Sequence, residues 1–271
     1  MRKSLDYYFD QKLADITLGQ KIIYWLALHL GGGTLRILYR VKFINTEIVK
    51  NMPKGEACIV AGNHSSYVDP CLVIRGLHPT RIRFIGKESL FSHKVVGRFL
   101  AYIGIYPVYK KQGDRSVIKR SVRNLRNGEH IGIFPEGTRV KERDKEKVES
   151  YGGVALIAKM ADVKIVPVGI QGAIDISPDG SKRMHFPKIT LRFGEPVYWR
   201  DYEHLGKRDI FEAVTDEVMR RAWALEAGEE PEILPPPTVE EYEALKAQRA
   251  AERAAQEQPG EQAGDSGEGA L

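Results

Sequence analysis

Short apolar runs alternate along the chain with longer stretches of helical period. Alternation of this kind predicts βα units and a mostly parallel sheet. The runs that we expect to be strands are 57–62, 81–86, 104–109, 130–135, 164–170 and 188–194. The stretches that we expect to be helices are 11–40, 68–77, 93–102, 114–127, 150–161 and 207–226. The predicted fold class is therefore α/β, with a mostly parallel central sheet flanked by helices.

The N-terminal part has a pattern of its own, because its best apolar run, IIYWLALHL at 22–30, ends in three glycines. This run is much shorter than the roughly 20 residues that a membrane span requires. Basic and aromatic residues in and around it, such as Lys21, Trp25 and Arg36, fit a helix that lies in the membrane interface. A helix packed on the domain explains the same pattern equally well. We expect an amphipathic, membrane-associating helical segment over residues 1–42, followed by the main domain over 43–226.

The composition changes after residue 226, where the chain becomes rich in acid and proline and then poor in apolar residues. A segment of this kind buries too little apolar surface to offset the entropy lost on ordering. We therefore expect residues 227–271 to form an acidic, largely disordered tail. Within it, alanine and glutamate favour a charged helix over 239–256.

The net charge is +5, and the positive excess lies before the acidic tail. A basic surface suits anionic partners, namely phosphate-bearing substrates, anionic lipid headgroups or nucleic acid. No helix-turn-helix, RNP or zinc-finger pattern supports a nucleic-acid partner, and we expect none. Cys58 and Cys71 are the only cysteines and do not suggest a disulfide framework, which favours a reducing compartment.

The octapeptide NHSSYVDP, residues 63–70, follows the first predicted strand. Open α/β sheets place their ligand sites at the carboxyl ends of the strands. The five-residue separation lets the Asp69 carboxylate accept a hydrogen bond from one ring nitrogen of His64, which leaves the other nitrogen as a base. Alternatively, Asp69 or Ser66 merely caps a helix and His64 is a polar loop residue. Spacing alone favours the helix cap.

A second polar turn, Glu136-Gly137-Thr138-Arg139, follows the predicted strand 130–135. We expect the two turns to meet at one edge of the sheet and to form one site. Arg139 offers a planar fork for phosphate, Gly137 lets the backbone approach a ligand, and Glu136 can accept from a hydroxyl or orient the arginine. An ordinary turn with a surface ion pair explains the tetrapeptide alone equally well.

Two other kinds of site find no support in the sequence. There is no GxSxG nucleophile elbow, and the GDSG at 264–267 lies in the acidic tail without a strand pattern around it. The histidines and cysteines lack the spacing of a zinc finger or an HExxH helix, so we expect no metal.

Four motifs in order, NHSSYVDP, IGKESLF, FPEGTR and IVPVGI, resemble the four sequence blocks of the glycerolipid acyltransferase family, typified by 1-acylglycerol-3-phosphate acyltransferases. The resemblance covers roughly residues 40–200. It implies transfer of a fatty acyl group from acyl-CoA or acyl carrier protein to a free hydroxyl of a lysophospholipid or glycerol phosphate, with no cofactor beyond the donor. It also implies that His64 is the general base, that Asp69 orients it, and that no acyl-enzyme forms.

The same resemblance implies that Lys87, Lys110 and Arg139 form a cationic cradle for the acceptor phosphate. The resemblance extends this substrate site to Glu136, Gly137 and Thr138. Lysophosphatidate is the leading acceptor, and its product is phosphatidate in phospholipid synthesis. Ser89 and Lys110 depart from the family pattern, so another lysolipid or glycolipid acceptor stays an alternative, as does a non-catalytic lipid-binding module. The implied location is the cytoplasmic face of a membrane, where a peripheral or monotopic enzyme meets anionic lipid.

Overall fold

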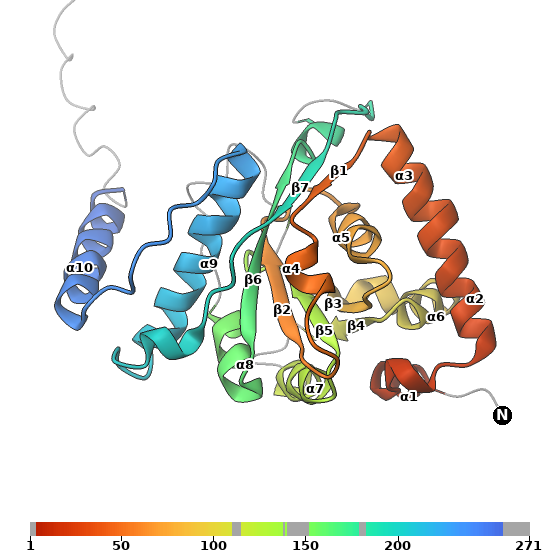
Figure 1. Ribbon diagram of the computed structural model, residues 1–271, viewed down its shortest axis with the longest axis horizontal. Coiled ribbons are helices and arrows are strands. Elements are labelled where there is room, and N and C mark those ends of the chain that lie inside the picture. The colour runs from red at the N-terminus through yellow and green to blue at the C-terminus, as the bar shows by residue number, and fades with distance from the viewer. Residues whose placement is uncertain (1–3, 110–114, 138, 140–151, 179–182, 257–271) are drawn as a thin grey trace, which may run out of the picture.

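The computed structural model of the protein describes residues 4–109, 115–137, 139, 152–178 and 183–256. A central sheet organises this part of the chain (Figure 1). Its strands are β1 (Lys42–Ile44), β2 (Cys58–Gly62), β3 (Ile82–Lys87), β4 (Ile105–Val108), β5 (His130–Ile133), β6 (Lys164–Gln171) and β7 (Thr190–Phe193). They lie in the order β1-β7-β6-β2-β5-β3-β4.

The strand pairing is mostly parallel, as the sequence predicts. Strand β2 lies between β5 and β6 and pairs in parallel with both, while β3 pairs in parallel with β5 and β4. The one antiparallel pair among the strands described joins β6 and β7, and β1 then pairs in parallel with β7. Strand β1 was not predicted, because three residues are too few to show a period. The α/β fold class is confirmed.

Helices cover both faces of the sheet. They are α1 (Leu5–Asp10), α2 (Leu18–Leu26), α3 (Gly32–Leu38), α4 (Glu47–Lys50), α5 (Asp69–Leu77), α6 (Lys94–Tyr102), α7 (Arg115–Arg126), α8 (Gly153–Ala161), α9 (Asp209–Ala227) and α10 (Val239–Gln256). One buried apolar cluster joins the sheet to α2, α4 and α5, and a second joins it to α7, α8 and α9. The large core that this packing makes supplies most of the driving force for folding.

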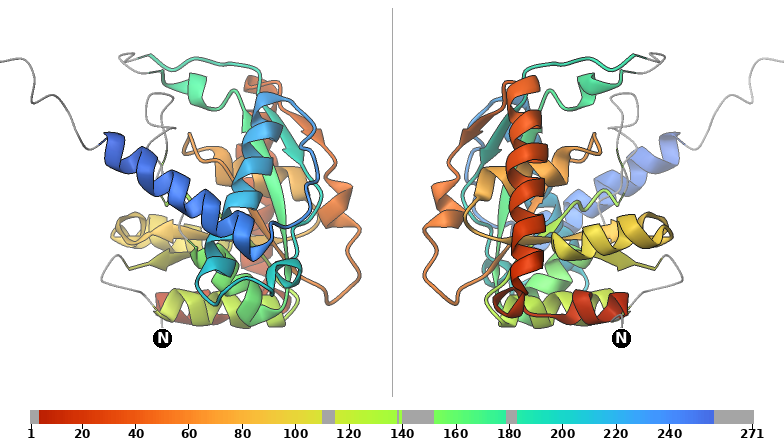
Figure 2. Two further views of the ribbon diagram at one scale, coloured as in Figure 1. Left: turned by 90° about the vertical axis from the view of Figure 1, so that its left-hand side faces the viewer. Right: turned by 90° about the vertical axis from the view of Figure 1, so that its right-hand side faces the viewer.

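The predicted helix over 11–40 is shorter at its start and is interrupted. Thr17 and Gln20 form a capping box that begins α2 at Leu18. A π-helical turn over Ala27–Gly31 then connects α2 to α3, and the two run as one rod in the right-hand view of Figure 2. Helix α1 was not predicted. Among the residues described, no helix is both long enough and apolar enough to cross a bilayer.

The rod of α2 and α3 has one buried face and one exposed face. Tyr24 and Leu28 are buried in the core, as a packed helix requires. The opposite face exposes large apolar side chains. They are Leu18, Ile22, Trp25, Leu26, Leu30, Ile37 and Leu38.

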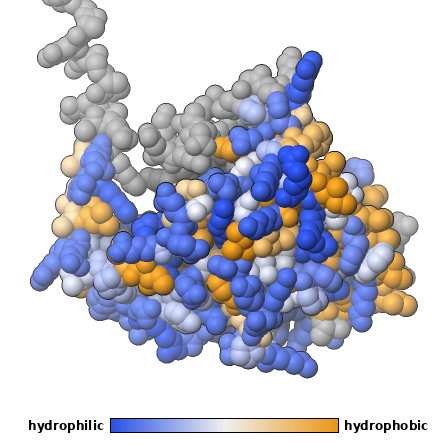
Figure 3. Space-filling model, turned by 45° about the horizontal axis from the view of Figure 1, so that its top comes forward, coloured by the Kyte–Doolittle hydropathy of each residue, from blue (hydrophilic) through white to orange (hydrophobic). Residues whose placement is uncertain are grey.

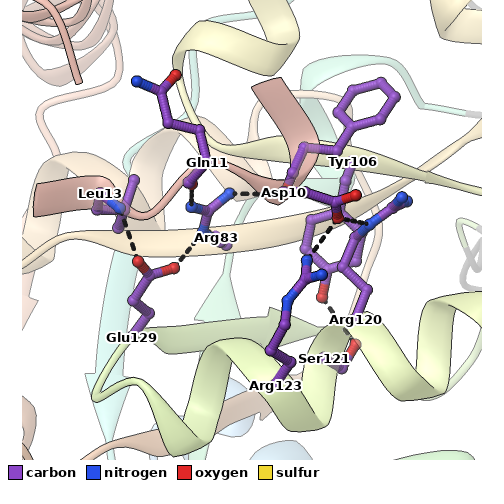
Figure 4. Close-up of polar contacts among 10 residues, drawn as sticks. Asp10, Gln11, Leu13, Arg83, Tyr106, Arg120, Ser121, Arg123 and Glu129 are labelled. Carbon is purple, nitrogen blue, oxygen red and sulfur yellow. Dashed lines mark hydrogen bonds and ion pairs between the residues drawn. The ribbon is translucent and has the colours of Figure 1, made fainter. Parts of the chain in front are cut away.

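A buried arginine ties the N-terminal residues to the domain (Figure 4). Arg83 of β3 is 2% exposed and donates to the Glu129 carboxylate at 2.6 Å and to the backbone oxygens of Phe9 and Gln11. The other Glu129 oxygen accepts from the backbone amide of Leu13 at 2.6 Å. Since a buried charge needs a full set of partners, these bonds fix the course of residues 9–13 across the lower end of the sheet.

The prediction of a largely disordered tail over 227–271 is wrong for residues 239–256, which form α10. Tyr242 is only 2% exposed because it packs into the core cluster that includes α9, and Lys246 pairs with Asp209 at 2.8 Å. The left-hand view of Figure 2 shows α10 beside α9. The charged helix expected there is confirmed, but the acidic composition concealed the buried aromatic anchor. Residues 257–271 lie outside the part described.

Candidate active site

The loop between β2 and α5 folds around one carboxylate. Asp69, the first residue of α5, has no exposed surface, and its Oδ2 accepts from the backbone amides of Ser65 at 2.9 Å and Ser66 at 2.8 Å. The same oxygen lies 2.8 Å from Nδ1 of His64. Asp69 therefore organises the preceding loop and does not merely cap α5, because its partners are His64 and the amides of the loop before the helix. The Ser66 hydroxyl does accept from the backbone amide of Val68 at 3.5 Å, so the capping role that the alternative gave to Ser66 is present beside the His64 contact.

The ring of His64 is held in one orientation by two contacts. A carboxylate only accepts hydrogen bonds, so Nδ1 of His64 carries the proton that it donates to Asp69 and Nε2 is left as an acceptor. The ring of Phe134 stacks on the imidazole with centroids 4.2 Å apart and an angle of 11° between the planes. The side chain of His64 is still 18% exposed, which leaves a path from solvent to the ring. This arrangement can remove a proton from an alcohol.

Glu136 connects the second polar turn to the first. It is 4% exposed and lies after β5, where its Oε2 accepts from the backbone amide of His64 at 2.8 Å. Its Oε1 accepts from the indole nitrogen of Trp223 in α9 at 3.4 Å. Burial raises the pKa of Glu136 to about 7, although both hydrogen bonds act in the opposite direction. Glu136 thus supports the backbone of His64; the predicted role in orienting Arg139 is not what its contacts show.

Arg139 is instead oriented by Tyr67 of the first turn. Its guanidinium lies 3.5 Å from the centre of the Tyr67 ring and donates to the Tyr67 hydroxyl at 2.7 Å. Both side chains are exposed, and Tyr67 is 70% exposed. A planar cation held in this way presents its remaining N–H groups to an anion.

The other predicted substrate-binding residues differ in their placement. Gly137 has a φ of +64°, a conformation that glycine adopts without strain, and its amide bonds to Phe134 in a tight turn. Lys87 ends β3 at the same edge of the sheet, where it is exposed and lines a pocket with Phe9 and Phe91. No contact joins it to His64 among the described residues. Lys110 and Thr138 lie outside the part of the chain that is described.

Three residues of the site escaped the sequence analysis. Asn63 forms two hydrogen bonds to the backbone of Ile170, Phe134 stacks on His64, and Trp223 reaches Glu136 from α9. Asn63 and Phe134 are the first residues of NHSSYVDP and FPEGTR and could have been noticed there. Trp223 has no local signal, because its partner lies 87 residues away in the chain.

A metal ion near this pair would need several ligating side chains close together. Among the described residues, no group of three or more His, Cys, Asp or Glu side chains could hold a metal ion. Within that part of the chain, the chemistry at hand consists of an imidazole with a carboxylate behind it, a buried acid and a surface arginine.

Comparisons with known proteins identify the family of the chain. A family model described as Acyltransferase matches residues 41–171. The 1-acyl-sn-glycerol-3-phosphate acyltransferase of Bacillus subtilis is 33% identical over 186 residues, which cover 69% of this chain and 88% of that protein. The Streptococcus pneumoniae protein of the same name is 27% identical and is covered to 59%. The fold is also similar to a crystal structure, that of the 1-acyl-sn-glycerophosphate acyltransferase PlsC from Thermotoga maritima. The two superpose with a TM-score of 0.54 at 23% sequence identity, and the match covers 82% of this chain and 95% of that one. This likeness supports the fold. The chain belongs to the 1-acyl-sn-glycerol-3-phosphate acyltransferase family.

Proposed function

We propose that the protein transfers a fatty acyl group from a thioester donor, acyl-CoA or acyl carrier protein, to the free hydroxyl of a 1-acylglycerol 3-phosphate. The product is phosphatidate, a precursor in phospholipid synthesis. The observation that carries the proposal is the 2.8 Å contact between His64 and Asp69 at the carboxyl end of β2. Relatives that carry the name of this activity support the choice of acceptor.

The reaction follows from the protonation state of the His64 ring. Nε2 accepts the proton of the acceptor hydroxyl while the hydroxyl oxygen attacks the carbonyl carbon of the thioester. The tetrahedral intermediate collapses, the carbon–sulfur bond breaks, and the imidazolium returns its proton to the departing thiolate. Asp69 stabilises the imidazolium and fixes the ring, and a general base of this kind contributes about 10²- to 10⁴-fold in rate. No serine nucleophile is required.

Arg139 and Lys87 are proposed to bind the acceptor phosphate. Both are exposed cations at the edge of the sheet where His64 lies, and Arg139 is held in place by Tyr67. Gly137 lets the backbone of the second turn approach the ligand. We also assign Lys110 and Thr138 to this site, on the family resemblance alone, because both lie outside the described residues.

The lipid substrates are proposed to enter from a membrane surface on which the rod of α2 and α3 lies. Figure 3 shows apolar side chains gathered on the side of the molecule that this rod forms, at the right of the view. Trp25 is 54% exposed there and Leu30 is 63% exposed. Val95 and Phe99 of α6 are also exposed. Exposed apolar residues with basic neighbours are typical of a helix seated in the membrane interface.

The test is release of free CoA from palmitoyl-CoA by the wild type and by His64→Ala. Lysophosphatidate, glycerol 3-phosphate and a set of other lysolipids are offered as acceptors. We expect release with lysophosphatidate, and its loss in the variant while the circular dichroism spectrum is unchanged. His204→Ala is the matched control, because His204 is an exposed histidine whose ring contacts only the backbone of Pro237. Undiminished activity in His64→Ala would overturn the mechanism, and activity with another acceptor alone would overturn the substrate.

A further inference from the structure

A cluster of basic side chains lies at the amino end of the sheet, away from the candidate active site. His78 follows the last residue of α5, and Arg75 lies in its last turn. Arg81 immediately precedes β3, Lys50 ends α4, and His29 comes from the π-helical turn between α2 and α3. We call these five residues the basic cluster. Because Asp69 begins α5 and His78 follows its end, the length of this helix, about 13 Å at 1.5 Å per residue, separates the cluster from the catalytic pair.

The cluster contains polar atoms that are buried without a partner. They are Nε of Arg75, Nδ1 of His78 and Nη1 of Arg81. The two arginine nitrogens are obligatory donors, and the histidine nitrogen becomes one when the ring is protonated. Buried donors are nearly always satisfied, so several of them in one place indicate an acceptor that belongs there.

The charged groups that act on the His78 ring are basic. Burial lowers the pKa of His78, and His29, Arg75, Lys50 and Arg81 lower it further, in that order. No carboxylate is among the described groups that act on this ring. The C-terminal end of α5 offers only a partial negative charge. Several cations held close together, arginines above all, are a common way in which proteins recognise phosphate.

The packing keeps these side chains in place. Arg75 lies against Gly32 of α3, where a Cβ atom would come within 3.2 Å of its Cδ, so the glycine makes room for the arginine. The guanidinium of Arg81 lies 4.1 Å from the centre of the Tyr24 ring, and the rings of His29 and His78 are 5.4 Å apart, edge to face. The cluster is thus a formed site rather than a set of mobile surface chains.

The cluster is also linked to the exposed apolar face of the rod. Trp25, on that face, stacks on His29 with centroids 4.6 Å apart, and its backbone oxygen accepts from Nδ1 of His29 at 2.9 Å. Nδ1 therefore carries a proton, and Nε2 of His29 can donate to a phosphate only when the ring is protonated. Headgroup phosphates lie just above the depth at which a tryptophan sits in a bilayer interface.

We propose that the basic cluster is a second phosphate-binding site, separate from that of the acceptor substrate. It would take the phosphate of an anionic phospholipid headgroup or of a soluble phosphate ester. The proposal goes beyond the proposed function and does not depend on its chemistry, since binding is measured without an acyl donor.

The test compares wild type, Arg75→Gln/His78→Gln and the control Lys207→Gln/Arg208→Gln, which removes basic side chains from an exposed turn before α9. Sedimentation with phosphatidylcholine vesicles, with or without phosphatidylglycerol, measures lipid binding. Binding of soluble anions is measured as the rise in the thermal unfolding midpoint in sodium phosphate or glycerol 3-phosphate, relative to the midpoint in chloride at equal ionic strength.

We expect the cluster variant to bind the anionic vesicles roughly 10-fold more weakly than the control, because each basic residue near an anionic surface adds about 1 kcal/mol. Equal binding to phosphatidylcholine alone and an unchanged circular dichroism spectrum would show that the variant folds. A phosphate-induced rise in the midpoint that only the cluster variant loses would identify a soluble ester as the ligand. Equal behaviour of the cluster and control variants in both arms would overturn the proposal. If the double variant fails to fold, the single variant His78→Gln is compared with the control in the same two assays.

Discussion

The backbone amide of His64 donates a hydrogen bond to the carboxylate of Glu136 at 2.8 Å, so the third sequence motif holds the main chain of the first. The two motifs are therefore held together at this point, and a change in one can shift the other. The side chain of His64 is positioned by Asp69 within its own loop, whereas its backbone is positioned from the neighbouring strand. Changes to either carboxylate should alter the base in different ways.

Asp69→Asn should reduce kcat by about 10²-fold or more, because the amide no longer stabilises the imidazolium and can hold the ring in the wrong tautomer. Steady-state kinetics with lysophosphatidate measures the effect. Asp162→Asn is a matched control: Asp162 is exposed and has a left-handed backbone, with a φ of 58°, that asparagine tolerates. Equal kinetics for the two variants would show that Asp69 is only structural.

Glu136→Gln should change how stability depends on pH. The folded-state pKa is raised from 4.5 to about 7, so the native state binds this proton more tightly than the unfolded chain does. The wild type therefore loses stability as pH rises from about 4.5 to 7, by roughly 3 kcal/mol at about 1.4 kcal/mol per unit. The glutamine variant lacks this loss. Urea unfolding of both proteins at several pH values measures their free energies of unfolding. A difference between these free energies that does not change with pH would contradict the raised pKa of Glu136.

Trp223→Phe removes the indole N–H and keeps an aromatic ring. Since that N–H lowers the pKa of Glu136, the variant should raise it and should shift the acid limb of the kcat/KM profile to higher pH. We expect kcat/KM of the variant to be about threefold lower than that of the wild type at acid pH and equal to it at alkaline pH. A uniform loss at every pH would indicate damaged packing instead. Trp199→Phe, which removes an indole that is not bonded to Glu136, is the control.

Arg139→Gln should raise the KM for lysophosphatidate about 10-fold, the effect of one lost charge-assisted hydrogen bond, while kcat changes little. Arg139→Lys should recover only part of that affinity because the planar fork is lost. Tyr67→Phe keeps the ring beneath the guanidinium and removes only the hydroxyl, so a smaller change in KM is expected. If all three variants keep the wild-type KM, the phosphate lies elsewhere.

Tyr242→Ala should destabilise the protein by about 3 to 5 kcal/mol, because it empties a buried aromatic site between α10 and the core. Tyr242→Phe should be neutral or stabilising, since the buried hydroxyl has no hydrogen-bond partner. Denaturant unfolding measures both. Arg249→Gln, which breaks a half-buried ion pair with Asp216, should cost about 1 kcal/mol. A small effect of the alanine variant would mean that α10 detaches readily.

The sheet could be predicted from the sequence because its buried strands are continuous apolar runs bounded by glycine, proline or polar turns. Ile59 and Ile131 pair across β2 and β5 in the register that such strands require. The short elements β1 and α4 could not be found, since a few residues carry no measurable period. Tyr242 was overlooked because a composition averaged over many residues hides one buried side chain.

The site was predictable where its residues lie close in sequence. His64 and Asp69 are near enough for spacing to suggest their hydrogen bond, and the resemblance strengthened that interpretation. The links between motifs were not predictable, because Glu136 could serve any nearby donor. Only the parallel pairing of β2 and β5 decides that the donor is the amide of His64.

Asn63 has a consequence for motion in the site. Its side-chain oxygen and nitrogen bond to the amide and carbonyl of Ile170, at 2.8 and 3.1 Å, just as a further strand residue would. The main chain is thus anchored to β6 at Asn63 and to Glu136 at the next residue. We expect the backbone of His64 to fluctuate on the picosecond-to-nanosecond timescale no more than the sheet does, with an order parameter near 0.85, although it lies in a loop. The backbone that carries the proposed base is therefore as rigid before the substrate binds as a β-strand of the sheet.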